Sequence, residues 1–238
     1  MDKKLALLKE KTIVALDVDT LEEAEHFTRI LSPYINKFKV GSRLFSALGP
    51  AVFKCIEKYD AKIFLDLKYH DIPSVVGSSC KVIAENHPSV FLITVHASGG
   101  LAMIAAAVEA VEFRDDLDIV AVTALTSLSS SEMGLLGISL TLEDWAEKLG
   151  DLAIDAGAAG LVCSPREVEA FRLRFGKAPI FITPGIRPEN KRQGRDDQTR
   201  TRTPAEALDA GSTYLVIGRP IYQSEDPIAT LKAIAENL

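Results

Sequence analysis

Asp66, Lys68 and Asp71 bring two acids and a base together in one short run of the chain. The run reads DLKYHD and directly follows the apolar stretch IFL at residues 63–65, which predicts a strand. Because side chains alternate along a strand, we expect Asp66 and Lys68 to share one face. Buried alternating charges are costly unless they form a network, and such networks tend to mark active sites. The run therefore predicts electrostatic chemistry, although a structural ion pair and, for Asp71, a helix N-cap remain open.

Two further charged residues stand at or inside predicted strands. Lys39 lies inside the segment FKV, and Asp17 ends the apolar run IVAL at residues 13–16. A lysine inside a covered strand needs charged partners, because an unpaired buried charge is unfavourable. We therefore expect Lys39 to join the network of Asp66 and Lys68. Asp17 is a site candidate by its position, and on its own it equally fits a loop acid or an N-cap.

The last two predicted strands both continue into a glycine and an arginine. Gly218 and Arg219 follow the segment YLVI, and Arg187 follows the segment IFIT through the letters PGI. Glycine lets an anion approach backbone N–H groups, and arginine binds phosphate through paired charged hydrogen bonds. A turn with a surface cation is the alternative for one such pair alone. The polar stretch 187–202 is then either a solvated connection or a lid over a phosphate.

Short apolar, β-branched segments alternate with amphipathic stretches of helical length. The predicted strands are residues 12–16, 37–40, 62–67, 90–95, 119–124, 160–163, 180–183 and 214–217. The predicted helices are residues 20–31, 50–59, 73–85, 101–113, 142–156, 165–175, 204–210 and 227–237. This alternation predicts an α/β fold, a (β/α)8 TIM barrel with its site at the carboxyl ends of the strands. An open doubly wound sheet is the alternative, and the lack of GxGxxG after the first strand disfavours its dinucleotide-binding form.

The bulk composition limits the classes of partner. The chain has 238 residues, 47% of them hydrophobic, and we expect a single domain over residues 1–238. The formal net charge of −6 argues against nucleic-acid binding but leaves room for a small anion at a local basic site. We expect no membrane span and no signal peptide. The three cysteines are far apart without a CxxC pair, which disfavours disulfides and structural zinc and fits a cytoplasmic protein.

By its ordered motifs, the sequence resembles the orotidine 5′-phosphate decarboxylase family over nearly the whole chain. The motifs are VALD at 14–17, KVG at 39–41, FLDLKYHDIP at 64–73, TVHA at 94–97, TPGIRP at 183–188 and VIGRP at 216–220. The resemblance implies a (β/α)8 homodimer that converts orotidine 5′-phosphate to UMP and CO2 without a metal or organic cofactor. It also implies that Asp71, with Ile72 beside it, reaches the active site of the neighbouring subunit.

The resemblance also implies roles residue by residue. The implied catalytic residues are Lys68, Asp66, Asp71 and Lys39. The implied substrate-binding residues are Asp17, Lys39, Ile72, Thr126, Arg187, Gln198, Gly218 and Arg219. Asp17 and Lys39 match the ribose side, and Thr126 matches the pyrimidine side. The phosphate side is matched by Arg187, Gln198, Gly218 and Arg219.

Such a reaction leaves a carbanion at C6 of the pyrimidine, and we expect the Lys68 ammonium to stabilise it and then donate the proton. Asp66 would lie beside the departing carboxylate and repel it in the ground state. One alternative is a magnesium-dependent sugar-phosphate enzyme on the same DxKxxD barrel. Its probability is lowered by Ile72 and Pro73 and by the TPGIR run, which favour the nucleotide enzyme. The other is a catalytically silent phosphate-ligand binding protein, which has no need of so costly a charge array.

Overall fold

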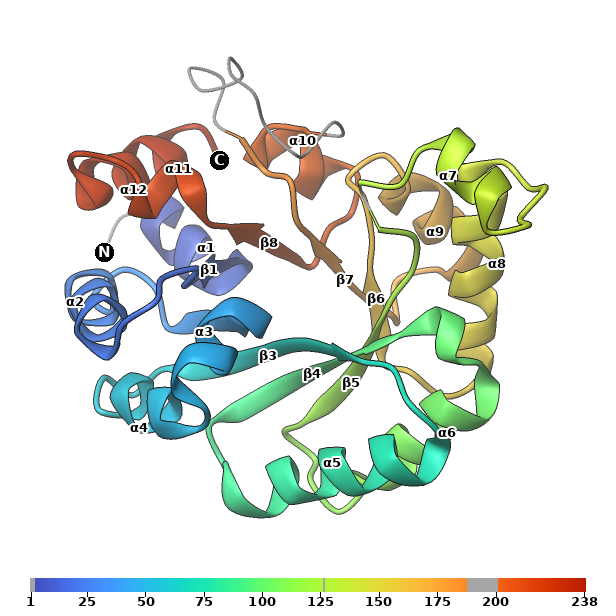
Figure 1. Ribbon diagram of the computed structural model, residues 1–238. Helices are drawn as coiled ribbons and strands as arrows, with labels where there is room; N and C mark the ends of the chain where they lie inside the picture. The colour runs from blue at the N-terminus through green and yellow to red at the C-terminus, as the bar shows by residue number, and fades with distance from the viewer. Residues whose placement is uncertain (1–2, 126, 188–200) are drawn as a thin grey trace.

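Eight parallel strands close into a barrel. A computed structural model describes residues 3–125, 127–187 and 201–238, and within these ranges each strand pairs with the next and the last with the first (Figure 1). The strands are β1 (Thr12–Ala15), β2 (Lys37–Gly41), β3 (Lys62–Tyr69), β4 (Val90–His96), β5 (Asp118–Val122), β6 (Gly160–Val162), β7 (Ile180–Thr183) and β8 (Tyr214–Ile217). The predicted (β/α)8 barrel is confirmed, and the open doubly wound sheet is wrong.

Helices surround the barrel on its outer side (Figure 1). They are α1 (Lys3–Lys11), α2 (Leu21–Leu31), α3 (Ser42–Leu48), α4 (Ala51–Glu57), α5 (Pro73–Asn86), α6 (Leu101–Glu109), α7 (Ser130–Leu135), α8 (Leu142–Asp155), α9 (Val168–Phe175), α10 (Pro204–Asp209), α11 (Arg219–Tyr222) and α12 (Pro227–Glu236), with a 3-10 turn η1 (Ala97–Gly99). None of the helices in the described ranges is both long enough and apolar enough to cross a bilayer.

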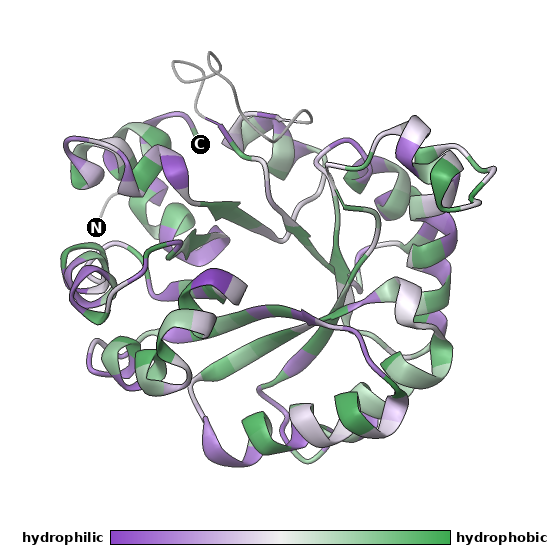
Figure 2. Cartoon of the chain, in the orientation of Figure 1, coloured by the Kyte–Doolittle hydropathy of each residue, from purple (hydrophilic) through white to green (hydrophobic). Residues whose placement is uncertain are grey.

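The strands bury both of their faces, which explains why they appear in the sequence as continuous apolar runs. Ile13, Phe64 and Val120 belong to a cluster inside the barrel. Val14 and Leu65, their neighbours in sequence, belong to the larger layer between strands and helices. Figure 2 shows the strands as mostly hydrophobic and the helices as mixed. The alternation decides which residues reach the interior, and therefore which reach the mouth of the barrel.

Helix starts follow capping chemistry where the local sequence supplies it. Thr20 and Thr203 each accept a hydrogen bond from the backbone N–H three residues on, and a glutamate there closes a capping box. The predicted helix at 165–175 begins later, at Val168, because Ser164 and Glu167 form a turn first. Four helices were not predicted. α3, α7 and α11 are too short to show a clear period, and α1 buries only Leu8.

Gly160 gives a test of the barrel packing. A Cβ at Gly160 would lie 1.9 Å from the carbonyl oxygen of Ile180 on the neighbouring strand β7. We expect Gly160→Ala to lower the free energy of unfolding by about 1–3 kcal/mol, since the close-packed strands must separate to admit it. Urea unfolding would measure the change.

Gly134→Ala is the matched control, because a Cβ there, on α7, meets nothing within 4 Å. Alanine is the better helix former, so this variant should be as stable as the unmodified chain or slightly more stable. Equal stability of the two variants would contradict the packing argument.

Candidate active site

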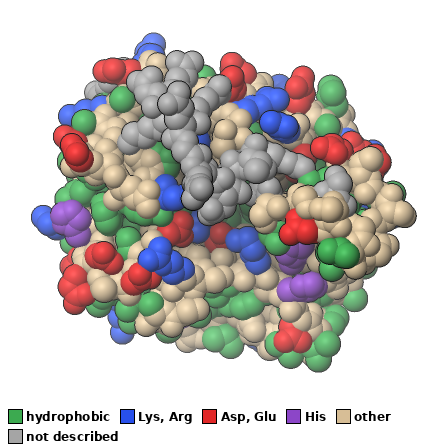
Figure 3. All heavy atoms as spheres, turned by 45° about the horizontal axis from the view of Figure 1, so that its top comes forward, with side chains coloured by type: hydrophobic (Ala, Val, Ile, Leu, Met, Phe, Trp, Pro, Cys, Tyr) green, Lys and Arg blue, Asp and Glu red, His purple; other side chains and the backbone are tan. Residues whose placement is uncertain are grey.

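A cavity of about 310 Å³ opens at the carboxyl ends of the strands. Residues from the ends of β1, β2, β3, β5, β6, β7 and β8 line it, as a TIM barrel predicts. Seven of the predicted site residues are among them: Asp17, Lys39, Asp66, Lys68, Arg187, Gly218 and Arg219. Figure 3 shows basic and acidic side chains gathered near the middle of the face that it presents.

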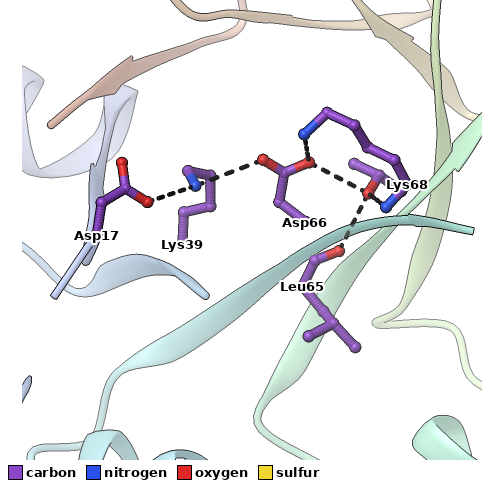
Figure 4. Close-up of polar contacts among 6 residues, drawn as sticks. Asp17, Lys39, Leu65, Asp66 and Lys68 are labelled. Atoms are coloured by element: carbon purple, nitrogen blue, oxygen red, sulfur yellow. Dashed lines mark hydrogen bonds and ion pairs between the residues drawn. The ribbon is translucent and has the colours of Figure 1, made fainter. Parts of the chain in front are cut away.

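Four of these side chains form one row of alternating charge (Figure 4). Lys39 Nζ lies 3.2 Å from Asp17 Oδ1 and 3.5 Å from Asp66 Oδ2. Lys68 Nζ lies 2.7 Å from Asp66 Oδ1 at the other end of the row. The predicted network of Lys39, Asp66 and Lys68 is thus present, and Asp17 extends it.

Strand alternation and register bring the row together. Ala15 and Phe64 point into the barrel, and Asp17 and Asp66 each follow two residues later on the same side. Lys39 pairs in register with Ala15 on one side and Phe64 on the other, so its backbone lies at the same height in the barrel as theirs. Gly41 leaves room for it, because a Cβ at that position would lie 2.7 Å from Lys39 Nζ.

The two inner charges of the row are the most buried. The side chains of Lys39 and Asp66 are each 12% exposed, whereas those of Lys68 and Asp17 are 36% and 37% exposed. Burial alone would lower the pKa of Lys39, but the charges of Asp66 and Asp17 outweigh it and raise that pKa. Burial would likewise raise the pKa of Asp66, but Lys39 and Lys68 outweigh it and lower that pKa. Each inner group keeps its neighbour charged, and Lys68 is left accessible to a ligand.

The backbone at Lys68 is irregular. Its φ is 51°, in the left-handed region that non-glycine residues rarely adopt. The buried Thr94 on β4 accepts a hydrogen bond from the Lys68 backbone N–H at 2.8 Å, and its Oγ1 lies 3.2 Å from Asp66 Oδ1. Thr94 was not among the predicted site residues. The feature of the sequence that could have indicated it is a polar residue inside the apolar strand segment LITV at residues 92–95.

Asp71 and Ile72 do not line the cavity. Asp71 is exposed, and its Oδ1 accepts a hydrogen bond from the Ile72 backbone N–H at 2.7 Å. The helix N-cap is Ile72 and makes no side-chain cap, so the N-cap interpretation of Asp71 is wrong. Among the described residues, Lys68 forms its ion pair with Asp66 and none with Asp71, so Asp71 does not extend the charged row.

The basic end of the cavity lies at β7 and β8. Gly218 precedes the short helix α11, whose first residue is Arg219, and both line the cavity. A Cβ at Gly218 would lie 3.2 Å from Ala15 Cβ, so glycine permits the close approach of this segment to β1. Arg187 is 7% exposed and donates to the carbonyl of Ile186 at 2.9 Å. Two guanidinium groups therefore border the same end of the cavity.

The remaining wall of the cavity is largely apolar. It includes Phe64, Val122, Val162, Pro184 and Val216. Predicted residues Thr126 and Gln198, and positions 188–200 of the predicted lid, lie outside the described residues. In the part of the chain that is described, no three His, Cys, Asp or Glu side chains are grouped as a metal site.

Known proteins share both the sequence and the fold of the chain. Residues 10–234 match the orotidine 5′-phosphate decarboxylase / HUMPS family. The chain is 42% identical over 227 residues to orotidine 5′-phosphate decarboxylase of Saccharophagus degradans, covering 95% of this chain and 94% of that protein. It is 43% identical over 230 residues to the enzyme of that name from Legionella pneumophila, covering 96% and 99%.

A solved structure agrees with these relatives. The crystal structure of orotidine 5′-phosphate decarboxylase from Lactobacillus acidophilus superposes with a TM-score of 0.80 at 34% identity, covering 95% of this chain and 98% of that one. The matched segment contains the charged row and the basic end of the cavity alike. The chain therefore belongs to the orotidine 5′-phosphate decarboxylase / HUMPS family.

Proposed function

We propose that the chain is a carboxy-lyase that converts orotidine 5′-phosphate to UMP and CO2, the closing step of UMP synthesis. The observation that carries this proposal is the order of groups around the cavity. In the strand order β8, β1, β2, β3, the residues that line the cavity are Arg219, then Asp17, then Lys39, and finally Asp66 with Lys68. A nucleotide has its phosphate, ribose and base in the same order. The names of the relatives agree with it.

In this proposal the substrate lies along that order. Its phosphate binds at the basic end, where guanidinium groups and backbone N–H groups suit a dianion. Asp17 and Lys39 bind the ribose hydroxyls. The pyrimidine lies against the apolar wall, with Thr126 on its polar edge. The residues proposed for the phosphate are Arg187, Gln198, Gly218 and Arg219.

The chemistry that we propose is electrostatic. Loss of CO2 from C6 leaves an electron pair in the plane of the ring, where the π system does not delocalise it. The Lys68 ammonium, held by Asp66, stabilises this charge as it develops and then donates a proton to C6. The Asp66 carboxylate lies beside the substrate carboxylate, and their repulsion ends when CO2 departs. Lys39 holds Asp66 from the other side, and no cofactor takes part.

We propose further that the protein acts as a homodimer and that Asp71 completes the partner's site. Asp71 is exposed and stands apart from the cavity of its own subunit, as such a role requires. Beside it, Ile72 is 62% exposed, and Val75, Val82 and Leu101 are exposed as well. Val75 and Val82 are seven residues apart on α5 and share one side of it, and Ile72 stands just before its first turn, so these apolar side chains form a surface that a second copy can cover.

Three other expectations stay predictions: a single domain over residues 1–238, a cytoplasmic location, and no binding of nucleic acid or membranes. The three cysteines, Cys55, Cys80 and Cys163, are free and buried.

The reaction itself is the first test. We expect the purified chain to consume orotidine 5′-phosphate with release of CO2, and excess EDTA to leave the rate unchanged, because Lys68 supplies the charge that a metal ion supplies elsewhere. The decrease in substrate absorbance measures the rate. Loss of the rate in EDTA would support a magnesium-dependent sugar-phosphate enzyme instead, and binding of UMP without turnover would support a silent binding protein.

Lys68→Ala tests the proton donor. We expect kcat to fall by at least about 10⁴-fold, since the variant loses both the cation beside the carbanion and the proton. Lys62→Ala is the matched control, because Lys62 is an exposed lysine at the opposite end of the same strand β3. A Lys68→Ala variant that keeps substantial turnover and folds normally would remove Lys68 from this role.

Mixed dimers test the position of Asp71. Lys68→Ala and Asp71→Ala subunits, each nearly inactive alone, should regain activity when they are co-refolded. Random pairing makes half of the dimers mixed, each with one intact site, so we expect about a quarter of the unmodified activity. Turnover is measured before and after the exchange of subunits. Continued inactivity of the mixture, with dimers formed, would mean that Asp71 acts within its own subunit or not at all.

A further inference from the structure

The register of β3 against β4 breaks at the charged row. Leu65 pairs with Ile93, and the next pair along is Tyr69 with Val95. Asp66, Leu67 and Lys68 therefore lie opposite one residue, Thr94. Extra residues on one strand form a bulge, which interrupts the ladder and redirects side chains. Here the bulge holds the aspartate and the lysine proposed to act on the substrate.

The Thr94 hydroxyl supplies the bonds that the broken ladder lacks. Thr94 Oγ1 accepts the Lys68 backbone N–H at 2.8 Å. It lies 3.2 Å from Asp66 Oδ1 and 3.5 Å from the Leu65 carbonyl oxygen, either of which can accept its proton. Figure 4 shows the Leu65 carbonyl directed at this point of contact. One hydroxyl thus ties the backbone of the lysine to the side chain of the aspartate.

The position of Thr94 fits a supporting role rather than contact with substrate. Its side chain is fully buried, and it is not among the described residues that line the cavity. It is the β4 residue that faces the bulge, and Lys68 at that bulge has a φ of 51°. A backbone in this region persists only where the surroundings hold it.

We propose that Thr94 is a positioning residue for decarboxylation, whose hydroxyl holds Lys68 in its left-handed conformation and the Lys68 ammonium on Asp66. This inference rests on the proposed function. Removal of the hydroxyl leaves the Lys68 N–H without its acceptor and takes from Asp66 Oδ1 one of its two donors, so that only the Lys68 ammonium still holds that oxygen. The bulge then relaxes, and the ammonium moves away from the reacting carbon. Three of the residues proposed to bind phosphate, Arg187, Gly218 and Arg219, follow β7 and β8 and are not disturbed.

Thr94→Val is the test, because valine keeps the branched shape and removes only the hydroxyl. We expect kcat to fall by about 10- to 100-fold, since a small misplacement of a reacting group costs about 100-fold. KM for orotidine 5′-phosphate should stay within about threefold, because remote phosphate contacts supply much of the binding. Thr94→Ser should restore kcat to within about threefold of the unmodified chain, because serine keeps the donor and the acceptor.

Thr28→Val is the matched control for loss of a buried threonine hydroxyl. Thr28 is fully buried in α2, and its Oγ1 donates to the carbonyl of Ala24 at 2.7 Å, away from the cavity. This variant should keep the kcat of the unmodified chain at a temperature where it and Thr94→Val are both folded by circular dichroism.

Several outcomes would overturn the inference. Unchanged kcat in Thr94→Val would do so, as would a rise in KM without a fall in kcat. A serine variant as slow as the valine variant would mean that packing, not the hydroxyl, matters. In each case the unmodified chain is active and the proposed function stands. An unmodified chain that does not decarboxylate orotidine 5′-phosphate would instead remove the proposed function, and this inference with it.

Discussion

The ion pair between Lys39 and Asp66 is the interaction on which the rest of the site depends. Both side chains are nearly removed from water, and either charge alone would be strongly unfavourable there. Asp17 and Lys68 flank the pair and complete its neutralisation. Glycine at position 41 follows from it, because a side chain there would displace the Lys39 ammonium. The buried pair thus holds Asp17 and Lys68 in place, and these two side chains are the ones more exposed to the cavity.

Closure of the barrel is what joins the two ends of the site. Arg219 and Asp17 are far apart in sequence, yet β8 pairs with β1 and both residues line one cavity. An open sheet with the same elements would leave its last strand and its first strand as separate edges. The pairing of β1 with β8 therefore joins two local motifs in one cavity, with the basic motif at one end and the row of alternating charge at the other.

The parts of this architecture that depend on local sequence could be predicted. The strands are buried on both faces and are continuous apolar runs, so their positions could be predicted. Alternation predicted that Asp66 and Lys68 share a face, and the cost of an unpaired buried charge predicted that Lys39 joins them. What depends on pairing between strands could not be predicted. The bulge opposite Thr94 exists only in the register of β3 with β4. Asp71 fits an N-cap by local pattern, whereas in the folded chain the helix begins one residue later, with Ile72 as its N-cap.

The left-handed backbone at Lys68 sets backbone strain against electrostatic stabilisation at one position. Glycine adopts that conformation without strain, and asparagine tolerates it, but a lysine there costs about 1–2 kcal/mol. Neither replacement has an ammonium group. Either replacement would relieve the backbone strain but would also take the ammonium away from the buried Asp66 carboxylate. The strain at this residue is therefore balanced inside the site, by the ion pair that the same side chain forms.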